Sequence, residues 1–203
     1  MRDSNGPMLA ALCRSRGWPA VMRPAVADEE NAVRRLFADA GGAEDVLVTS
    51  GGVSAGDLDL LPEHAERAGF EILFHGVAVR PGKPIAFGRK GATLWFGLPG
   101  NPVSTSVCFH VFVRTALDSL EGADPAGPAF VQALLTREMQ LRGKRETYRD
   151  ALLAVVEGEN RATPLESRGS HDLAAHARSN VLIRVPAGTD RLAAGSLVDC
   201  LRL

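Results

Sequence analysis

One stretch, from Asp45 to Asp59, constrains the fold of this chain more than any other. The run Asp45 to Thr49 has the apolar, β-branched character of a strand buried on both faces of a parallel sheet. Gly51, Gly52 and Gly56 follow at once, and they let the backbone turn with positive φ and approach a ligand closely. Free N–H groups in such a turn suit an anion, and open α/β sheets bind ligands at the carboxyl ends of their strands. A tight turn without a ligand is the alternative that glycine richness leaves open.

Helix and strand patterns alternate along the first part of the chain. Apolar residues at helical spacing predict helices, and β-branched runs predict strands. Helices are expected from Pro7 to Gly17, after Asp28, from Leu60 to Ala68 and after Pro102. Strands are expected at Asp45 to Thr49 and Phe70 to Val79, with a weak candidate at Pro19 to Met22. Ile85 to Gly88 and Thr93 to Gly97 are expected to form a hairpin around residues 89–91. This alternation predicts a mostly parallel sheet with helices on its faces, a three-layer αβα arrangement.

A linker divides the chain at Glu121 to Pro128, where turn-forming residues replace any apolar periodicity. We therefore expect an α/β domain over residues 1–122 and a second domain over 129–203. Short β-like runs characterise the second domain: Phe130 to Leu135, Thr147 to Val156, Val181 to Val185 and Leu197 to Leu203. They predict a small all-β barrel or sandwich.

Charge and cysteine content exclude several classes of protein. The formal net charge of -1 argues against a broad basic face for nucleic acid. The three cysteines are far apart and form no CxxC pair, which favours reduced thiols in a cytoplasmic protein. The chain contains no apolar run of membrane-spanning length and no signal-peptide pattern at its start. We expect a soluble cytoplasmic protein without nucleic-acid or membrane partners.

Three glycine-containing turns follow three β-like segments, at Ser50 to Asp59, Arg80 to Pro84 and Pro99 to Ser104. If the strands are parallel neighbours, the turns meet at one edge of the sheet. That edge carries carboxylates, cations and polar groups: Asp57, Asp59, Arg80, Lys83, Asn101 and Ser104. Such a mixture fits a phosphorylated ligand with Mg²⁺, held by Asp59 and Asp57.

Each residue of this set also has a simpler interpretation. Asp59 serves equally well as a helix cap, and Asp57 as a solvated carboxylate. Arg80 and Lys83 are ordinary surface charges on a proline turn, and Asn101 fits a turn before a helix. The hypothesis of a site depends on their occurring together.

Five segments resemble, in order and spacing, the molybdopterin molybdenumtransferase family, which includes the E domain of gephyrin. They are DSN with PML (3–5, 7–9), SGGVSAGDLD (50–59), HGVAVRPGKP (75–84), GLPGNPVS (97–104) and RGSH (168–171). The resemblance covers essentially the whole chain. It implies a molybdopterin-binding α/β domain followed by the family's C-terminal β-barrel.

The resemblance implies a transferase of molybdenum cofactor biosynthesis. Adenylylated molybdopterin and molybdate are converted, with a divalent cation, to molybdenum cofactor and AMP. Catalytic roles fall to Asp59, Asp3, Arg80 and Lys83. Binding roles fall to Ser50, Gly51, Gly52, Ser54, Gly56, Asp57, Pro99, Gly100, Asn101, Ser104, Arg149 and Ser170.

The chain also departs from the family pattern. Many relatives have Lys where Arg80 stands, which replaces a point charge by a bidentate fork. The family's N-terminal domains and its first strand, with Gly-Asp-Glu, find no match, so we expect a C-terminal portion that lacks the first strand. The family is dimeric, and contact with a molybdopterin adenylyltransferase is a further expectation. The alternatives are a non-catalytic molybdopterin-binding or scaffold module, and a molybdopterin adenylyltransferase, which the barrel disfavours.

Overall fold

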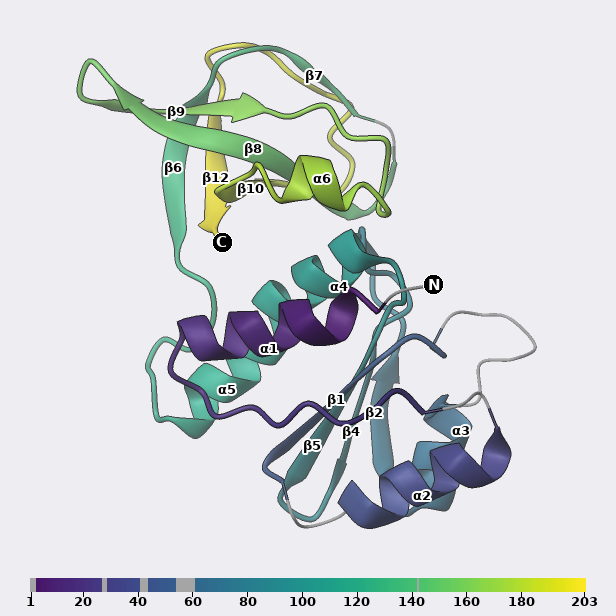
Figure 1. The fold of residues 1–203 in the computed structure, drawn as a ribbon. Coiled ribbons are helices and arrows are strands. Elements are labelled where there is room, and N and C mark those ends of the chain that lie inside the picture. Colours follow the sequence, from purple (N-terminus) through teal and green to yellow (C-terminus); the bar gives the residue numbers. More distant parts are fainter. Residues whose placement is uncertain (1–2, 27–28, 41–43, 54–60, 142) are drawn as a thin grey trace. The chain divides into compact units, whose positions relative to one another are not determined.

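The computed structural model describes residues 3–26, 29–40, 44–53, 61–141 and 143–203 (Figure 1). The chain forms two compact units. The first comprises Met1–Val77 and Gly82–Phe109, and the second comprises Ala78–Pro81 and His110–Leu203. The expected α/β fold followed by a small β-barrel is confirmed. The expected domain limits, 1–122 and 129–203, stay a prediction.

The first unit is a four-stranded sheet covered by helices on both faces (Figure 1). The strands, in spatial order, are β1 (Val46–Ser50), β5 (Thr93–Leu98), β4 (Ala86–Lys90) and β2 (Glu71–His75). The helices are α1 (Asn5–Ser15), α2 (Glu30–Ala40), α3 (Leu61–Arg67) and α4 (Pro102–Cys108). Helices α2 and α3 lie on one side of the sheet, and α1 and α4 lie on the other, as expected for three layers.

The prediction of a mostly parallel sheet is wrong. Only β1 and β5 pair in parallel, whereas β4 pairs antiparallel with both β5 and β2. The reason is the short hairpin at Gly91 (φ 58°), because so tight a connection can join only antiparallel strands. Strands β1, β5 and β2 nevertheless point the same way, so their carboxyl ends share one edge. The weak strand candidate Pro19 to Met22 forms no strand.

Aromatic side chains build the core between the sheet and α2 and α3. The rings of Phe37, Phe70 and Trp95 pack edge to face, with centroids 5.2 to 6.4 Å apart. Such contacts contribute about 0.5–1.5 kcal/mol each beyond simple burial. The Trp95 indole N–H also donates to Thr49 Oγ1 at 3.1 Å. The core thereby ties β5 to β1 just before the carboxyl end of β1.

The helical run that follows β5 continues from α4 through a π-helical turn, η1 (Phe109–Val113), into α5 (Arg114–Leu120). The long helix expected after Pro102 therefore runs without a gap to Leu120, with one π-helical turn inside it. The division between the two units falls within this helix, between Phe109 and His110. No helix among the described residues is long and apolar enough to cross a membrane.

The second unit contains a closed five-stranded barrel. Its strands are β6 (Phe130–Leu135), β8 (Glu146–Val156), β9 (Glu159–Pro164), β10 (Val181–Val185) and β12 (Leu197–Arg202). The order is β10, β12, β6, β9, β8, and pairing of β8 with β10 closes the ring. A two-stranded ribbon of β7 (Met139–Gln140) and β11 (Arg191–Leu192), and the short helix α6 (Leu173–His176), complete it.

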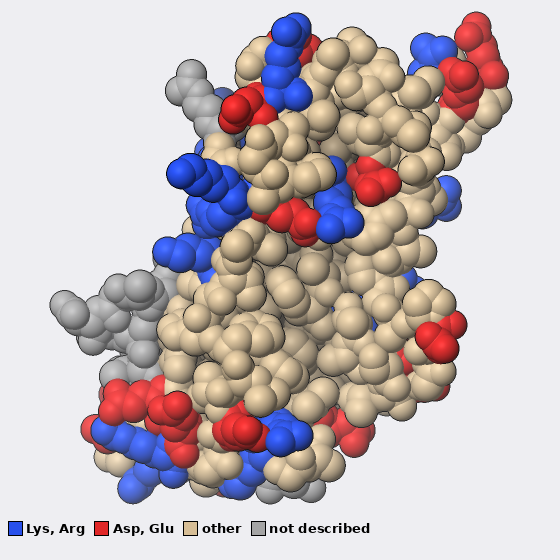
Figure 2. Space-filling view, turned by 180° about the vertical axis from the view of Figure 1, so that it is seen from behind, with Lys and Arg blue, Asp and Glu red and all other residues tan. Residues whose placement is uncertain are grey.

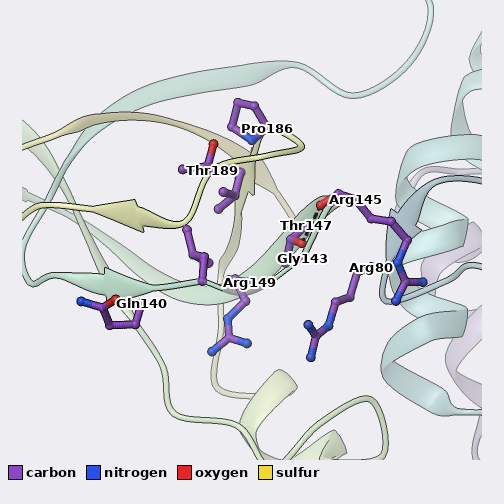
Figure 3. A pocket seen from close by; sticks show the side chains of 10 residues that line it. Arg80, Gln140, Gly143, Arg145, Thr147, Arg149, Pro186 and Thr189 are labelled. Atoms are coloured by element: carbon purple, nitrogen blue, oxygen red, sulfur yellow. Dashed lines mark hydrogen bonds between the residues drawn. The ribbon is translucent and has the colours of Figure 1, made fainter.

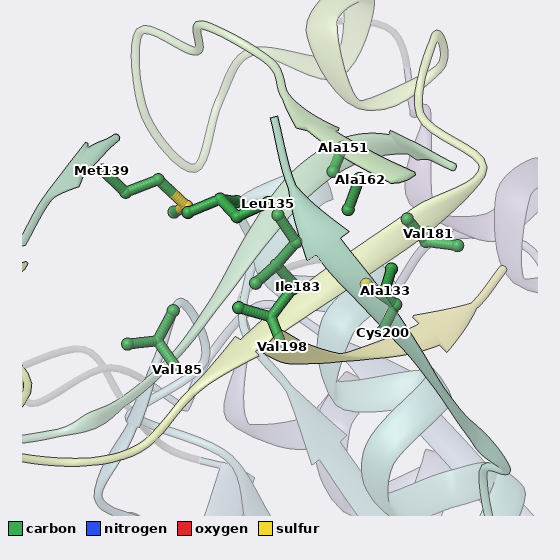
Figure 4. Packing of buried hydrophobic residues seen from close by; sticks show 10 residues of the cluster. All are labelled: Ala133, Leu135, Met139, Ala151, Ala162, Val181, Ile183, Val185, Val198 and Cys200. Carbon is green, nitrogen blue, oxygen red and sulfur yellow. The ribbon is translucent and has the colours of Figure 1, made fainter. Parts of the chain in front are cut away.

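Apolar side chains, most of them small or β-branched, form the core of this unit (Figure 4). They are Ala133, Leu135, Met139, Ala151, Ala162, Val181, Ile183, Val185, Val198 and Cys200. On β8 and β10 these are odd-numbered residues, because alternate side chains of a strand point to opposite faces. Odd-numbered positions of β8 therefore face the barrel interior.

The expected strand Phe70 to Val79 is divided. It breaks after His75 at Gly76, whose φ is 90°, and β3 (Val79–Arg80) leaves the first unit to pair in parallel with β8. Arg80 thus becomes a residue of the barrel sheet, opposite Thr147.

Candidate functional site

The turns after β1 and β5 are joined by hydrogen bonds at the carboxyl edge of the sheet. The side-chain amide of Asn5 donates to Ser50 Oγ at 2.7 Å and to the Gly100 carbonyl at 2.8 Å. Ser50 Oγ donates to the Pro99 carbonyl at 3.3 Å. The prediction that these two turns meet is confirmed, and Asn5 links them from the start of α1.

Glycine is required in the first of these turns. Gly51 and Gly52 adopt φ values of 91° and 66°, in the left-handed region that other residues occupy at a cost of about 1–2 kcal/mol. A Cβ on Gly100 would lie 3.7 Å from the Gly51 Cα, so the two turns pass close to each other. The end of β2 reaches the same turn, since His75 Nε2 lies 3.0 Å from the Val53 carbonyl.

The start of α4 forms the other part of this edge. Asn101 is the N-cap, in an extended conformation and without a side-chain capping bond, and Pro102 is the first helical residue. Thr105 Oγ1 donates to the Pro99 carbonyl at 2.6 Å and to the Asn101 carbonyl at 3.1 Å. Ser104 is buried within the helix. Thr105, rather than Ser104, holds the turn closed.

Asp3 has a structural role in the described residues. Its Oδ1 accepts hydrogen bonds from the backbone N–H groups of Asn5 at 2.9 Å and Gly6 at 3.1 Å, which caps the start of α1. A Cβ on Gly6 would lie 2.6 Å from Asp3 Oδ2, so glycine makes room for the carboxylate. The predicted catalytic role of Asp3 stays a prediction.

The third predicted turn, Arg80 to Pro84, is divided between the two units. Arg80 lies in β3 of the barrel unit, whereas Lys83 belongs to the first unit. Lys83 is exposed, and its carbonyl accepts from Val77 N at 2.9 Å. The expectation that all three turns form one edge of the sheet is therefore corrected for Arg80, which pairs with β8 instead.

A cavity of about 230 Å³ opens at one end of the barrel (Figure 3). Its lining comes from β3, β7, β8, the end of β10 and neighbouring loops: Arg80, Gln140, Leu141, Gly143, Arg145, Thr147, Arg149, Val185, Pro186 and Thr189. Thr147 and Arg149 continue the inward-facing row of β8 beyond Ala151, opposite Val185 and Ile183 of β10. The cavity is therefore the mouth of the barrel, a common place for a ligand.

The lining of this mouth is cationic. Among the described residues that line it are three arginines and no aspartate or glutamate. Glu146, at the start of β8, is even-numbered and so lies on the outward face of the strand. Its carboxylate pairs with Arg184 Nε and Nη2 at 2.9 and 2.8 Å. The Tyr148 hydroxyl also donates to Glu146 at 2.8 Å, and burial together with this carboxylate raises the pKa of Tyr148.

Charges elsewhere on the surface are mixed. On the face that Figure 2 shows, acidic and basic side chains lie interspersed rather than in one broad basic surface. The cationic character of the barrel mouth is therefore a local feature. Guanidinium groups around a concave site suit a small oxyanion or a phosphate group.

Sequence reasoning identified Arg80 and Arg149 but missed Arg145 and Thr147. Arg145 Nη1 donates to the Val79 carbonyl at 3.4 Å, and Thr147 Oγ1 donates to the Arg145 carbonyl at 3.0 Å. The available signal was the alternation of Thr147 and Arg149 on β8, with Arg145 directly before the strand.

The loop that carries Ser170 is organised by Asp172. The Asp172 carboxylate accepts from Arg168 N at 3.0 Å and from Ala175 N at 3.1 Å, and these bonds lower its pKa. Ser170 is half-buried in this loop and is not part of the cavity lining. Its predicted binding role stays a prediction.

Four predicted site residues, Ser54, Gly56, Asp57 and Asp59, lie outside the described residues. Within the described ranges, no group of three or more His, Cys, Asp or Glu residues could hold a metal ion. The guanidinium groups at the barrel mouth fit an anion and do not fit Mg²⁺. At the glycine turn the Gly51 N–H already donates to the Leu98 carbonyl at 2.9 Å.

Comparison with known proteins places the chain in a family. Residues 1–119 match the family described as "probable molybdopterin binding domain". The chain belongs to this family. Residues 132–203 match a second family, the MoeA C-terminal region (domain IV). The molybdopterin-binding domain and the barrel thus occur here in the order that the sequence resemblance predicted.

Relatives match the chain over both of its parts. A molybdopterin molybdenumtransferase of Staphylococcus epidermidis is 30% identical over 99% of the chain, and one of Staphylococcus aureus is 29% identical over 99%. The chain covers 48% of each, about half the length of these relatives. The crystal structure of a molybdopterin biosynthesis MoeA protein from Pyrococcus horikosii matches with a TM-score of 0.80 and 25% identity, covering 100% of this chain and 48% of that one.

Proposed function

We propose that the chain carries the molybdopterin-binding domain and the barrel of a molybdopterin molybdenumtransferase. In this reaction adenylylated molybdopterin receives molybdenum from molybdate, the phosphate anhydride is cleaved, and AMP leaves. The observation that carries the proposal is the arginine-lined mouth of the barrel, in a chain whose relatives bear this name.

The size of the barrel mouth favours a small anion. Pockets for drug-sized ligands measure about 300–1,000 Å³. The cavity, at about 230 Å³, is smaller than these and suits molybdate or a single phosphate group rather than a whole pterin nucleotide. Arg80 and Arg149 supply guanidinium groups that bind oxyanions through two parallel N–H donors.

The joined turns of the first unit supply the second element of the proposal. Positive-φ glycines after β1 let the backbone approach a ligand closely, and Asn5 holds this turn against Gly100. We assign the phosphate and pterin of adenylylated molybdopterin to these turns. Lys83 and Asp59 keep the catalytic roles predicted for them.

Positioning and charge neutralisation are the chemistry that these residues offer. Molybdate and the phosphates of adenylylated molybdopterin repel each other, and fixed guanidinium groups lower that repulsion. Mg²⁺, if bound, would supply further neutralisation at Asp57 and Asp59. The described residues offer no donor set for it.

The test is binding of adenylylated molybdopterin and of molybdate to the purified 203-residue chain, by pterin fluorescence and by calorimetry. We expect saturable but weak binding of adenylylated molybdopterin, and a loss of at least about tenfold in molybdate affinity in Arg149→Gln. Arg202→Gln is the matched control, because Arg202 is exposed at the far end of β12 and outside the cavity. A folded chain that does not bind adenylylated molybdopterin would refute the proposal.

A measurement of turnover distinguishes a catalytic chain from a non-catalytic binding module. Molybdate-dependent release of AMP would show that the chain is catalytic by itself, whereas binding without release would favour the non-catalytic binding module. We expect no release from this chain alone. A homodimer and contact with a molybdopterin adenylyltransferase are further proposals, which light scattering and pull-down of the purified proteins would test.

A further inference from the structure

A third arginine at the barrel mouth belongs to no predicted motif. Arg145 directly precedes β8, and Thr147 and Arg149 follow on β8 as alternate residues, which lie about 6.6–6.8 Å apart on one face of the strand. Arg80 stands directly opposite Thr147 on the adjacent parallel strand β3. Three guanidinium-bearing residues therefore surround one threonine, and all four residues line the cavity.

Arg145 is held in place by the backbone of β3. Its Nη1 donates to the carbonyl of Val79, the residue before Arg80. In Figure 3 the Arg80 side chain lies between those of Arg149 and Arg145. Arg145 is half-buried, so its charge is less screened by solvent than that of a surface arginine.

Acidic side chains do not cancel this charge. Among the described residues Arg145 makes no ion pair, and its neighbour Glu146 is already paired with Arg184. Lys144, the neighbour on the other side, is exposed and does not line the cavity. Arg145 and Lys144 carry the same charge, and they differ in that Arg145 lines the cavity.

We propose that Arg145 is a specificity-determining residue, which makes the barrel mouth select doubly charged over singly charged tetrahedral oxyanions. The inference rests on the proposed function, in that the barrel mouth is taken to bind an oxyanion. The energy between a fixed cation and a ligand is proportional to the charge of the ligand. Loss of the Arg145 charge therefore costs a dianion twice as much, in the logarithm of affinity, as it costs a monoanion.

Molybdate and perrhenate are suitable probes, because both are tetrahedral oxyanions of a heavy metal, with charges of two and one. Calorimetry on the 203-residue chain at constant ionic strength gives both affinities. We expect the unsubstituted chain to prefer molybdate. Arg145→Gln should lose about tenfold in affinity for molybdate and about threefold for perrhenate, the ratio that follows from the charges.

Two further variants separate charge from structure. Arg145→Lys keeps the charge and should retain the preference for molybdate, although it loses the guanidinium fork. Lys144→Gln makes the same change of charge one residue away and should leave both affinities within about twofold. Thermal unfolding of each variant checks that the barrel is folded.

Three results would overturn the inference: equal losses of affinity for the two anions in Arg145→Gln, no loss of affinity for either, or the same change of preference in Lys144→Gln.

Failure of the proposed function gives a different result. A chain that binds adenylylated molybdopterin but neither oxyanion keeps the proposed function and overturns the role of Arg145. A chain in which Arg145 controls the preference but adenylylated molybdopterin does not bind keeps that role and refutes the proposed function.

Discussion

A buried contact between an aspartate and a histidine in the barrel unit gives a sharp test of how the barrel is stabilised. Asp150 lies on β8 next to Arg149 but points away from the cavity, and its Oδ1 is 2.6 Å from His176 Nδ1 at the end of α6. The side chains of His176 and Asp150 are only 8% and 5% exposed. Ser179 Oγ lies 3.5 Å from the same carboxylate oxygen and donates to the His176 carbonyl at 2.6 Å. The pair fastens α6 and the loop before it to β8.

Removal of one partner of such a pair leaves a buried polar group unsatisfied. The usual cost is about 3–5 kcal/mol for a buried charged pair and about 1–3 kcal/mol for a neutral hydrogen bond. We therefore expect Asp150→Ala to lower the free energy of unfolding of the barrel unit by about 3 kcal/mol. For a unit of roughly 100 residues this corresponds to a fall in Tm of roughly 12–24 °C. Asp150→Asn keeps an oxygen that accepts from the imidazole, so its cost should be about 1 kcal/mol.

The chain offers a local probe for this experiment. Its single tyrosine, Tyr148, lies on β8, whereas Trp18 and Trp95 lie in the first unit. Near-ultraviolet circular dichroism of Tyr148 in urea follows the barrel, and tryptophan fluorescence follows the first unit. Glu166→Gln is the control, because its pair with Arg137 at 3.7 Å is exposed and such pairs contribute about 0–1 kcal/mol. A loss below about 1 kcal/mol in Asp150→Ala, equal to that of the control, would refute the reasoning.

Three other predictions concern the first unit. Asn5→Ala removes two hydrogen bonds, to Ser50 and Gly100, and should lower the free energy of unfolding by only about 1 kcal/mol for each bond. It should weaken binding of adenylylated molybdopterin severalfold in a fluorescence titration. Unchanged binding would exclude a role for the joined turns. Phe37→Ala removes the ring at the centre of the aromatic core and should lower the free energy of unfolding by about 3–5 kcal/mol, as measured by urea unfolding followed by tryptophan fluorescence. A loss below about 2 kcal/mol would show that the core can collapse around the change. Burial raises the pKa of the Cys108 thiol from 9.0 to about 12, so its alkylation, followed by mass spectrometry, should require unfolding. Above pH 9 the unfolded thiol loses its proton first, so the free energy of unfolding should fall as pH rises, and Cys108→Ala should remove that part of the fall.

Local patterns in the sequence were sufficient to predict most elements. The strand Val181–Val185 has the limits of its β-branched and apolar run, which Asn180 precedes and Pro186 follows. Such a run between turn-forming residues favours a strand over a helix or loop. The glycine turn after β1 and its approach to the turn after β5 were predicted correctly as well. Positive φ at Gly51 and the shared direction of β1 and β5 both follow from local rules. The strand Glu159–Pro164 was missed, because its polar and proline residues resemble those of a loop.

The order and pairing of strands could not be predicted from local patterns. Arg80 belongs to a predicted turn motif, yet the structure makes it a strand residue of the barrel sheet opposite Thr147. Arg145 resembles an ordinary solvent-exposed arginine in the sequence, and only the closure of the barrel places it beside a cavity with Arg80 and Arg149. The contact between Asp150 and His176 likewise depends on where α6 packs. The sequence alone therefore determined which residue types carry charge and where the chain turns, because propensity and periodicity act over a few residues. The tertiary structure decided which of those charges meet, because strand pairing between distant segments, and not spacing along the chain, sets the distances between them.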